Sequence, residues 1–297
     1  MTRYLITGVD GFMGGGMKKF LALEEPSAEV VGIGRGSNLT DVSVCEDVFS
    51  TNGSFDYIFH FADVNGNAEW SMAHAADQFF ANTKIGLNVL ENIVRFQKQA
   101  KFVGFSSLWA YPELATNFRE SDYWMGPLPE AIQHYGLSKK MLASGLAACA
   151  KQHGILGTML VLGSVYGPGD HSDHLIPSLI AKMKNNRHEL QVWGDGSQVR
   201  DFIFLDDQLR AIYLHKDYEG NLLNIAAGQP ASVREVVGHL KDLMNYGGEI
   251  KYTSVTTSPP DDRRLDMSLA THYSGWPGRF KLKTLAEGLK ITVGKGI

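Results

Sequence analysis

The stretch that decides the fold reads TGVDGFMG, residues 7–14, and it directly follows a short apolar run at residues 4–6. Gly8 permits a tight turn, Gly11 lets the backbone approach a phosphate group, and Gly14 lets a helix pack close to a sheet. Phe12 and Met13 then open a helix whose first N–H groups have no partner within the helix and attract anions. Because this pattern lies at a strand-to-helix junction near the N-terminus, it predicts a site for the pyrophosphate of a dinucleotide.

Outward from this loop, short apolar runs alternate with amphipathic stretches. We expect strands at residues 4–7, 29–33, 57–61, 102–106 and 156–162, and helices at residues 12–23, 75–97 and 135–153. Alternation of this kind predicts an α/β fold with a doubly wound, Rossmann-type parallel sheet covered on both faces.

The composition of the sequence changes after residue 163, where glycine, proline and short expected elements dominate. We expect residues 1–163 to form a dinucleotide-binding domain and residues 164–297 to form mainly a smaller, interleaved substrate domain. Segments near residues 200–226, in particular 202–204 and 222–225, are expected to return to the main sheet or its edge.

Composition narrows the class of protein. The chain has 297 residues, 44% of them hydrophobic and 20% charged, with a net charge of -4, which disfavours nucleic acid as the main partner. Cys45 and Cys149 are the only cysteines, so no disulfide framework is expected. An apolar run of about 20 residues, which a membrane span needs, is absent, and the N-terminal apolar run is too short for a signal peptide. We therefore expect a cytoplasmic protein that does not bind a membrane.

The second expected strand bears on the choice of cofactor. An NAD site usually places an acid at the end of this strand, whereas residues 30–38 read VVGIGRGSN and offer Arg35 instead. Because a guanidinium can pair with a 2'-phosphate, the sequence favours NADP, with NAD as the alternative.

Candidate catalytic residues come from two places. Tyr135 and Lys139 are four residues apart in an expected helix, so they share one face, where the ammonium favours the phenolate form of the tyrosine. Ser107 closes an expected strand, where its hydroxyl can donate a hydrogen bond to the same substrate oxygen. Together the three predict proton exchange with an alcohol or a carbonyl.

With these motifs in place, nearly the whole chain resembles the extended short-chain dehydrogenase/reductases, the NAD-dependent epimerase/dehydratase group. The resemblance rests on the glycine loop, the His60-Phe61-Ala62 strand end, Asn82, the Ser107/Tyr135/Lys139 group and Tyr166-Gly167-Pro168. It implies that Tyr135 is the acid/base, that Lys139 modulates it, and that Phe61, Ala62 and Asn82 line the cofactor. It also implies a homodimer, formed through the helices after Asn82 and around Tyr135.

Within that group, the segments at residues 106–112, 174–179, 192–196 and 200–202 are most similar to GDP-fucose synthases. That resemblance implies a GDP-linked 4-keto-6-deoxyhexose substrate and makes His174 the epimerising acid. Trp193, Arg200 and Arg263 match positions near the nucleotide.

The chain departs from the synthase pattern at three positions. Trp109 stands where the synthases have the cysteine that acts as epimerising base, and an indole cannot abstract a proton from carbon. Val161 and Ser164 stand where the wider group often has arginine and asparagine. A 4-keto reductase without epimerisation, or with one step assisted by His174, therefore fits as well as the full synthase, and Trp109 is expected to contact the substrate.

Three further readings of the sequence stay open. One is a redox-neutral epimerase or dehydratase with tightly bound NAD, acting on another nucleotide sugar. A second is a non-enzymatic dinucleotide sensor, although that reading leaves the Ser107/Tyr135/Lys139 group unexplained. A third is a metal site at residues 170–174, where two aspartates and two histidines cluster. We interpret that cluster as a solvated substrate loop and expect no metal.

Overall fold

The computed structural model describes residues 1–115, 117–253 and 262–296, and a six-stranded sheet forms the centre of the described part. All its neighbouring strands are parallel. In spatial order they are β10 (Leu222–Ile225), β6 (Gly157–Leu162), β4 (Lys101–Ser107), β3 (Tyr57–His60), β1 (Arg3–Thr7) and β2 (Glu29–Ile33). The chain runs outward from β1 in both directions, which makes the sheet doubly wound and confirms the expected Rossmann-type fold.

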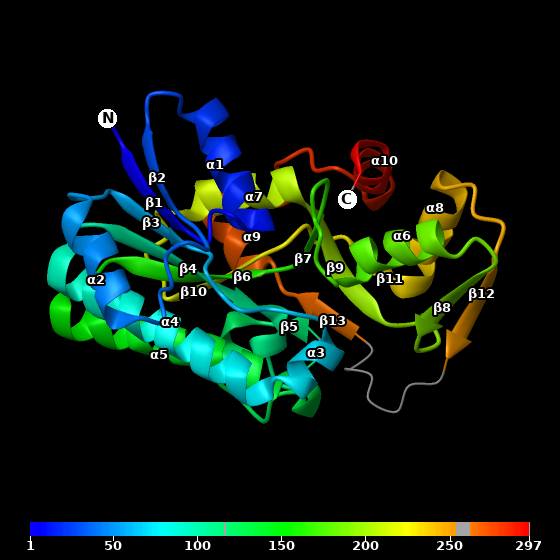
Figure 1. Cartoon of the computed structure of the whole chain (residues 1–297), viewed down its shortest axis with the longest axis horizontal. Helices are drawn as coiled ribbons and strands as arrows, with labels where there is room; N and C mark the ends of the chain where they lie inside the picture. Colours follow the sequence, from blue (N-terminus) through cyan, green and yellow to red (C-terminus); the bar gives the residue numbers. More distant parts are fainter. Residues whose placement is uncertain (116, 254–261, 297) are drawn as a thin grey trace.

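Helices cover both faces of this sheet (Figure 1). One layer holds α2 (Val42–Thr51), α4 (Ala75–Phe96) and α5 (Gln133–His153), and the other holds α1 (Phe12–Glu24), α7 (Leu205–His215) and α9 (Ser268–Ser274). Successive side chains of a strand point to opposite faces, so Leu5 packs in the first layer while Tyr4 and Ile6 pack in the second. Burial on both faces explains why these strands appear in the sequence as continuous apolar runs.

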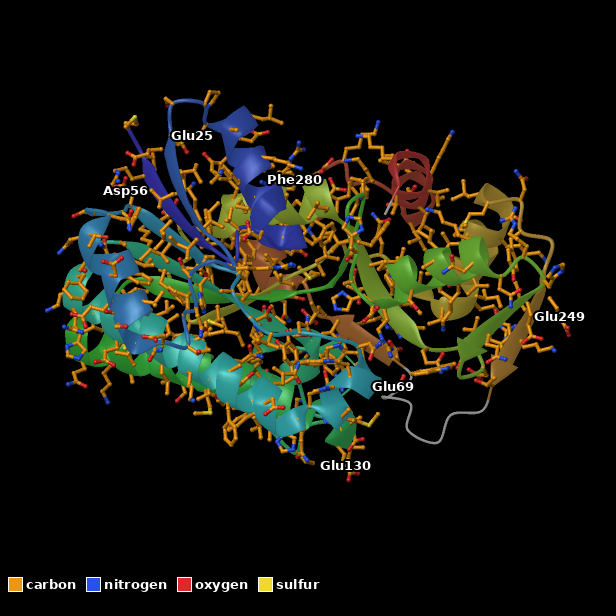
Figure 2. All side chains as sticks on the ribbon, viewed as in Figure 1. Glu25, Asp56, Glu69, Glu130, Glu249 and Phe280 are labelled. Atoms are coloured by element: carbon orange, nitrogen blue, oxygen red, sulfur yellow. The ribbon has the colours of Figure 1, made fainter. Side chains whose placement is uncertain are left out.

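The second half of the molecule is built on two smaller sheets. A five-stranded sheet holds β11 (Pro230–Ser232), β9 (Val199–Phe204), β13 (Asp262–Leu265), β5 (Asn117–Phe118) and β7 (Ser164–Tyr166), and β8 (Glu189–Trp193) pairs with β12 (Glu249–Thr253). Around a third apolar core lie α6 (Leu175–Asn185), α8 (Val233–Leu243) and α10 (Leu285–Lys295). Figure 2 shows Glu25, at the end of α1, and Glu249, in β12, at opposite sides of the molecule.

One expected strand lies elsewhere than predicted. Residues 222–225 do form the edge strand β10 of the main sheet, but residues 202–204 belong to β9 of the five-stranded sheet. The expectation for 202–204 is wrong because β9 runs between two cores. Ile203 packs in the core of the main sheet, whereas Phe202 and Phe204 pack in the core of the second half. Apolar residues on both faces make a strand look like part of the main sheet whichever sheet it joins.

A division of the chain near residue 163 stays a prediction, since the chain returns to the main sheet with α7 and β10 after it has entered the second half. In the described part of the chain, no helix combines the length and the apolar character needed to cross a membrane.

Candidate active site

The glycine loop closes the carboxyl end of β1 and forms one wall of a cavity of about 1230 Å³. Gly8 has a φ of +74°, and a Cβ there would lie 2.8 Å from the backbone nitrogen of Ala62. A Cβ on Gly14 would collide with the carbonyl oxygen of Gly8. No side chain caps the start of α1 and no acid lies in its first turn, so the helix N-terminus faces the cavity as an anion site.

Arg35 and Asp10 lie together at the end of β2. Arg35 is exposed and lines the cavity, and its backbone nitrogen donates a hydrogen bond to Asp10 Oδ2 over 2.7 Å. The sequence has no acid at the end of this strand, but the fold brings a carboxylate there from the glycine loop. Both an arginine and an acid are therefore within the region where a dinucleotide carries its adenosine ribose.

Ser107, Tyr135 and Lys139 line the same cavity from two elements, the end of β4 and the first turns of α5. Lys139 Nζ lies 5.3 Å from the centre of the Tyr135 ring, as the four-residue spacing on a helix requires. Ser107 Oγ accepts a hydrogen bond from the backbone nitrogen of Trp109 over 3.3 Å, which orients the hydroxyl at the strand end.

Asp63 is the residue at this site that sequence reasoning missed. Its Oδ2 lies 2.8 Å from Lys139 Nζ, and the Tyr135 hydroxyl donates to the same oxygen over 3.4 Å. A carboxylate directly after the His60-Phe61-Ala62 strand end was a signal, since ligands of α/β sheets bind at the carboxyl ends of strands.

The electrostatics of the site follow from burial. Burial first, and then the Asp63 carboxylate, raise the pKa of Tyr135 well above its usual value. Burial, followed by the charge of Lys139, lowers the pKa of His60 to about 3, so this imidazole is neutral at pH 7. His60 Nδ1 lies 2.8 Å from the Thr7 hydroxyl, which ties the end of β3 to the end of β1.

Residues of the second half form the opposite wall of the cavity. His174 is exposed at the N-terminus of α6, and Trp193, at the end of β8, is 53% exposed with Lys182 over its ring. Arg200 of β9 lines the cavity between these residues and Trp109. An open aromatic ring and several cationic or titratable groups suit a polar, anionic ligand with a flat base.

Two guanidinium groups hold the Trp109 indole. Arg200 Cζ lies 5.2 Å from the centre of its rings and Arg263 Cζ lies 4.6 Å away. Arg263 is fully buried and donates to the Leu108 carbonyl oxygen over 3.0 Å, while its Nε and Nη2 make no hydrogen bond within the described part of the chain. Burial, with the charge of Arg200, lowers the pKa of Arg263 to about 9.

The cavity brings together most of the residues that the sequence predicted for the site. Its lining includes Gly8, Gly11, Phe12, Met13, Gly14, Arg35, Phe61, Ala62, Ser107, Trp109, Tyr135, Lys139, His174, Trp193 and Arg200. Two predicted residues stand behind the lining. Asn82 is buried and makes hydrogen bonds to the backbone nitrogen and carbonyl oxygen of Val64, and Arg263 packs behind Trp109.

The histidine and aspartate cluster at residues 170–174 does not gather into a ligand set. Asp170 is buried, and its Oδ1 accepts from the backbone nitrogen of Ser172, whereas His171, Asp173 and His174 are exposed. Among the residues described here, no three histidine, cysteine or acidic side chains lie close enough to hold a metal ion.

Comparison with known proteins adds to this geometry. Residues 4–226 match the model of the NAD dependent epimerase/dehydratase family. A probable GDP-L-fucose synthase 1 of Oryza sativa subsp. japonica is 28% identical over 233 residues, which is 73% of this chain and 68% of that protein.

Two solved structures superpose on almost the whole chain. A GDP-mannoheptose C4 reductase from Campylobacter jejuni with NADP bound is 25% identical, with a TM-score of 0.84 and coverage of 99% of this chain and 97% of that one. A UDP-glucose 4-epimerase from Thermotoga maritima with UDP-glucose is also 25% identical, with a TM-score of 0.85 and coverage of 99% and 98%. The similarities thus include both a reductase and an epimerase.

Proposed function

Because the chain belongs to the NAD dependent epimerase/dehydratase family, we propose that this NAD(P)-dependent enzyme reduces a nucleotide-activated 4-keto-6-deoxyhexose. One observation carries the proposal. The glycine loop and the Ser107/Tyr135/Lys139 group line a single cavity, and Tyr135 is held in its protonated form there. A ketone reductase needs such a proton donor beside its hydride source.

NADP is the proposed cofactor, and when bound it supplies the hydride. The helix N-terminus at Phe12 faces the pyrophosphate position, and the exposed Arg35 guanidinium can pair with a 2'-phosphate. The similarity to an NADP-bound reductase agrees with this choice. NAD is the second candidate, because the Asp10 carboxylate beside Arg35 can accept a hydrogen bond from a free ribose hydroxyl.

The proposed substrate is a GDP-linked sugar. Trp193 offers an open ring on which a base can stack, and Arg200 offers a cation for a diphosphate. The similarities to a GDP-L-fucose synthase and to a GDP-mannoheptose reductase both concern GDP-sugars.

Reduction without epimerisation is the reading that Trp109 favours. Its indole takes the place of the cysteine base of the synthases and is packed against two arginines, so it offers no proton acceptor. His174 is the one remaining predicted proton carrier on the substrate side, which limits any epimerisation to a step that it assists.

The test is NADPH consumption with GDP-4-keto-6-deoxymannose in heavy water, followed by NMR of the product sugar. NADPH oxidation without deuterium at C3 or C5 is the expected result and identifies a plain 4-reductase. Deuterium at either carbon would mean that the enzyme has replaced the cysteine base. Failure to oxidise NADPH would contradict the proposal for this sugar.

A redox-neutral epimerase with tightly held NAD is the second candidate, favoured by the similarity to a UDP-glucose 4-epimerase. Such an enzyme keeps its cofactor through the cycle, whereas a reductase must exchange it at every turnover. We expect the purified protein to lose its dinucleotide on dialysis. NAD that survives dialysis in stoichiometric amount would favour the epimerase.

We further propose a homodimer formed through α4 and α5, which pack side by side on one face of the sheet (Figure 1). Their outer surface exposes four large apolar side chains, Phe80, Leu87, Leu137 and Met141. Grouped apolar exposure of this kind is typical of an interface. Light scattering after size exclusion should give a dimer for the wild type and a monomer for Leu87→Glu. A monomeric wild type would contradict this proposal.

A further inference from the structure

Asp63 lies at the meeting point of the two residues that carry protons in this site. It lies three residues after the end of β3 and lines the cavity, and its side chain is 25% exposed. Its Oδ2 accepts hydrogen bonds from Lys139 Nζ over 2.8 Å and from the Tyr135 hydroxyl over 3.4 Å. One carboxylate oxygen therefore contacts both groups at once.

The backbone around Asp63 is held firmly. Asn82 accepts from the Val64 backbone nitrogen over 2.6 Å and donates to the Val64 carbonyl oxygen over 2.9 Å. On the other side, the Ala62 nitrogen donates to the Thr7 hydroxyl over 3.2 Å. These contacts on both flanks make the position of the carboxylate a property of the fold rather than of a loose loop.

The charges around Tyr135 come from three elements. Asp63 faces it from the end of β3, Lys139 from its own helix, and the buried Tyr123 from the segment before that helix. His60, the next titratable group, is neutral at pH 7 because it is buried. An isolated Lys139 ammonium would favour the phenolate, but its ion pair with Asp63 offsets that charge. Accepting the phenolic hydrogen bond, Asp63 also favours the protonated tyrosine directly.

We propose that Asp63 is a positioning residue that keeps the Tyr135 hydroxyl in its acid form, so that the site delivers protons to a carbonyl oxygen rather than removing them from an alcohol. This inference deepens the proposed reductase function and rests on it for its direction. Reduction of a carbonyl starts from a protonated tyrosine, whereas oxidation of an alcohol starts from a tyrosinate. Asp63 therefore favours reduction.

The chemical step balances with the groups named. When bound, NADPH would supply a hydride to the carbonyl carbon. As the C–O π bond breaks, Tyr135 gives its hydroxyl proton to the carbonyl oxygen. NADP⁺ and the alcohol are the products. The tyrosinate left behind regains a proton from water, and Asp63 restores the hydrogen bond that holds it.

The experiment is an ultraviolet titration of Tyr135 in the protein without substrate. Tyrosinate absorbs near 295 nm, and the signal of this residue is isolated by subtracting the Tyr135→Phe variant from each background. In Asp63→Asn we expect Tyr135 to ionise at a pH at least about 1 unit below that of the wild type, because one charge at hydrogen-bond distance shifts a pKa by about 1 to 3 units. Where the wild type unfolds before Tyr135 ionises, the pH of unfolding sets its lower limit.

Two control variants test whether the charge of Asp63 causes the shift. Asp63→Glu keeps the charge and should retain the late ionisation. Asp10→Asn removes a carboxylate of the same cavity that accepts a hydrogen bond from the Arg35 backbone nitrogen, not from Tyr135, and should leave the titration unchanged. Asp63→Ser repeats the test if Asp63→Asn does not fold. Ionisation of Tyr135 in Asp63→Asn at the wild-type pH or later would overturn the proposal.

The same variants separate this proposal from the proposed function. With a reducible substrate, the alkaline limb of the NADPH oxidation rate should move to lower pH in Asp63→Asn by the amount seen in the titration. If no tested sugar oxidises NADPH, the reductase assignment fails while the titration still decides whether Asp63 controls Tyr135. If the sugar is reduced but the Tyr135 titration does not move, the assignment of Asp63 fails alone.

Discussion

Substituting Arg263 with methionine is expected to stabilise the protein. Arg263 is fully buried, forms no ion pair among the described residues, and has two nitrogens without hydrogen bonds. The Glu113 carboxylate offsets its charge only in part. Burial lowers the pKa of Arg263 from the usual value to about 9. The folded state therefore binds this proton less firmly than the unfolded chain does. At every pH below about 9 the buried guanidinium is charged, and the stability of the folded state is reduced by the full free energy of burying that charge. This cost is relieved only as the pH rises above about 9, towards the usual pKa of an arginine.

The magnitude follows from these values and from what methionine would lose. At ~1.36 kcal/mol per pKa unit, the lowered pKa corresponds to a cost of ~5 kcal/mol at pH 7. Methionine forfeits the hydrogen bond to Leu108, worth ~1 kcal/mol, and the contacts of the cation with Trp109 and Phe118, worth ~0.5 to 2 kcal/mol each. When these losses are subtracted from the cost, the free energy of unfolding should rise by up to ~3 kcal/mol and should not fall.

Urea unfolding of the wild type and Arg263→Met at pH 7 measures this change. Arg264→Met is the matched control, because Arg264 is the exposed neighbour on the same strand and should change the free energy by less than ~0.5 kcal/mol. A loss of more than ~1 kcal/mol in Arg263→Met would refute the argument that this charge is only partly compensated.

Three further predictions concern the site and the junction between the halves. Tyr135→Phe should lower the turnover number by at least ~100-fold while fluorescence titration finds NADPH affinity nearly unchanged, since only the proton donor is lost; full activity would refute the assignment. Arg35→Ala should weaken binding of NADPH more than that of NADH, and equal losses would refute the 2'-phosphate contact. Tyr111→Phe should lower the free energy of unfolding by ~1 to 3 kcal/mol in urea, because it leaves Asn224 Oδ1 without its buried 2.7 Å hydrogen bond; an unchanged midpoint would contradict this.

Most of the predictions that the structure confirms depend on residues that lie close together in the sequence. The alternation of apolar strands and amphipathic helices depends on residues a few positions apart, and so does the four-residue spacing of Tyr135 and Lys139. The glycine loop is equally local, because its turn and the start of its helix lie within residues 8–14. For this reason the sequence alone determined the Rossmann-type sheet, the glycine loop at its strand-to-helix junction, and the tyrosine and lysine pair on one helix face.

Only the tertiary structure decided the features that join distant segments. It paired Asp63 with Tyr135 across 72 positions, brought Asp10 to Arg35, and placed β9 in the second sheet. It also buried Arg263 behind Trp109, with a hydrogen bond that spans 155 positions. No local pattern encodes such contacts, because they depend on which strand ends the folded sheet brings to one edge and on how two cores share a strand. The sequence thus specified the chemistry available to the site, whereas the fold decided which charges surround the proton donor.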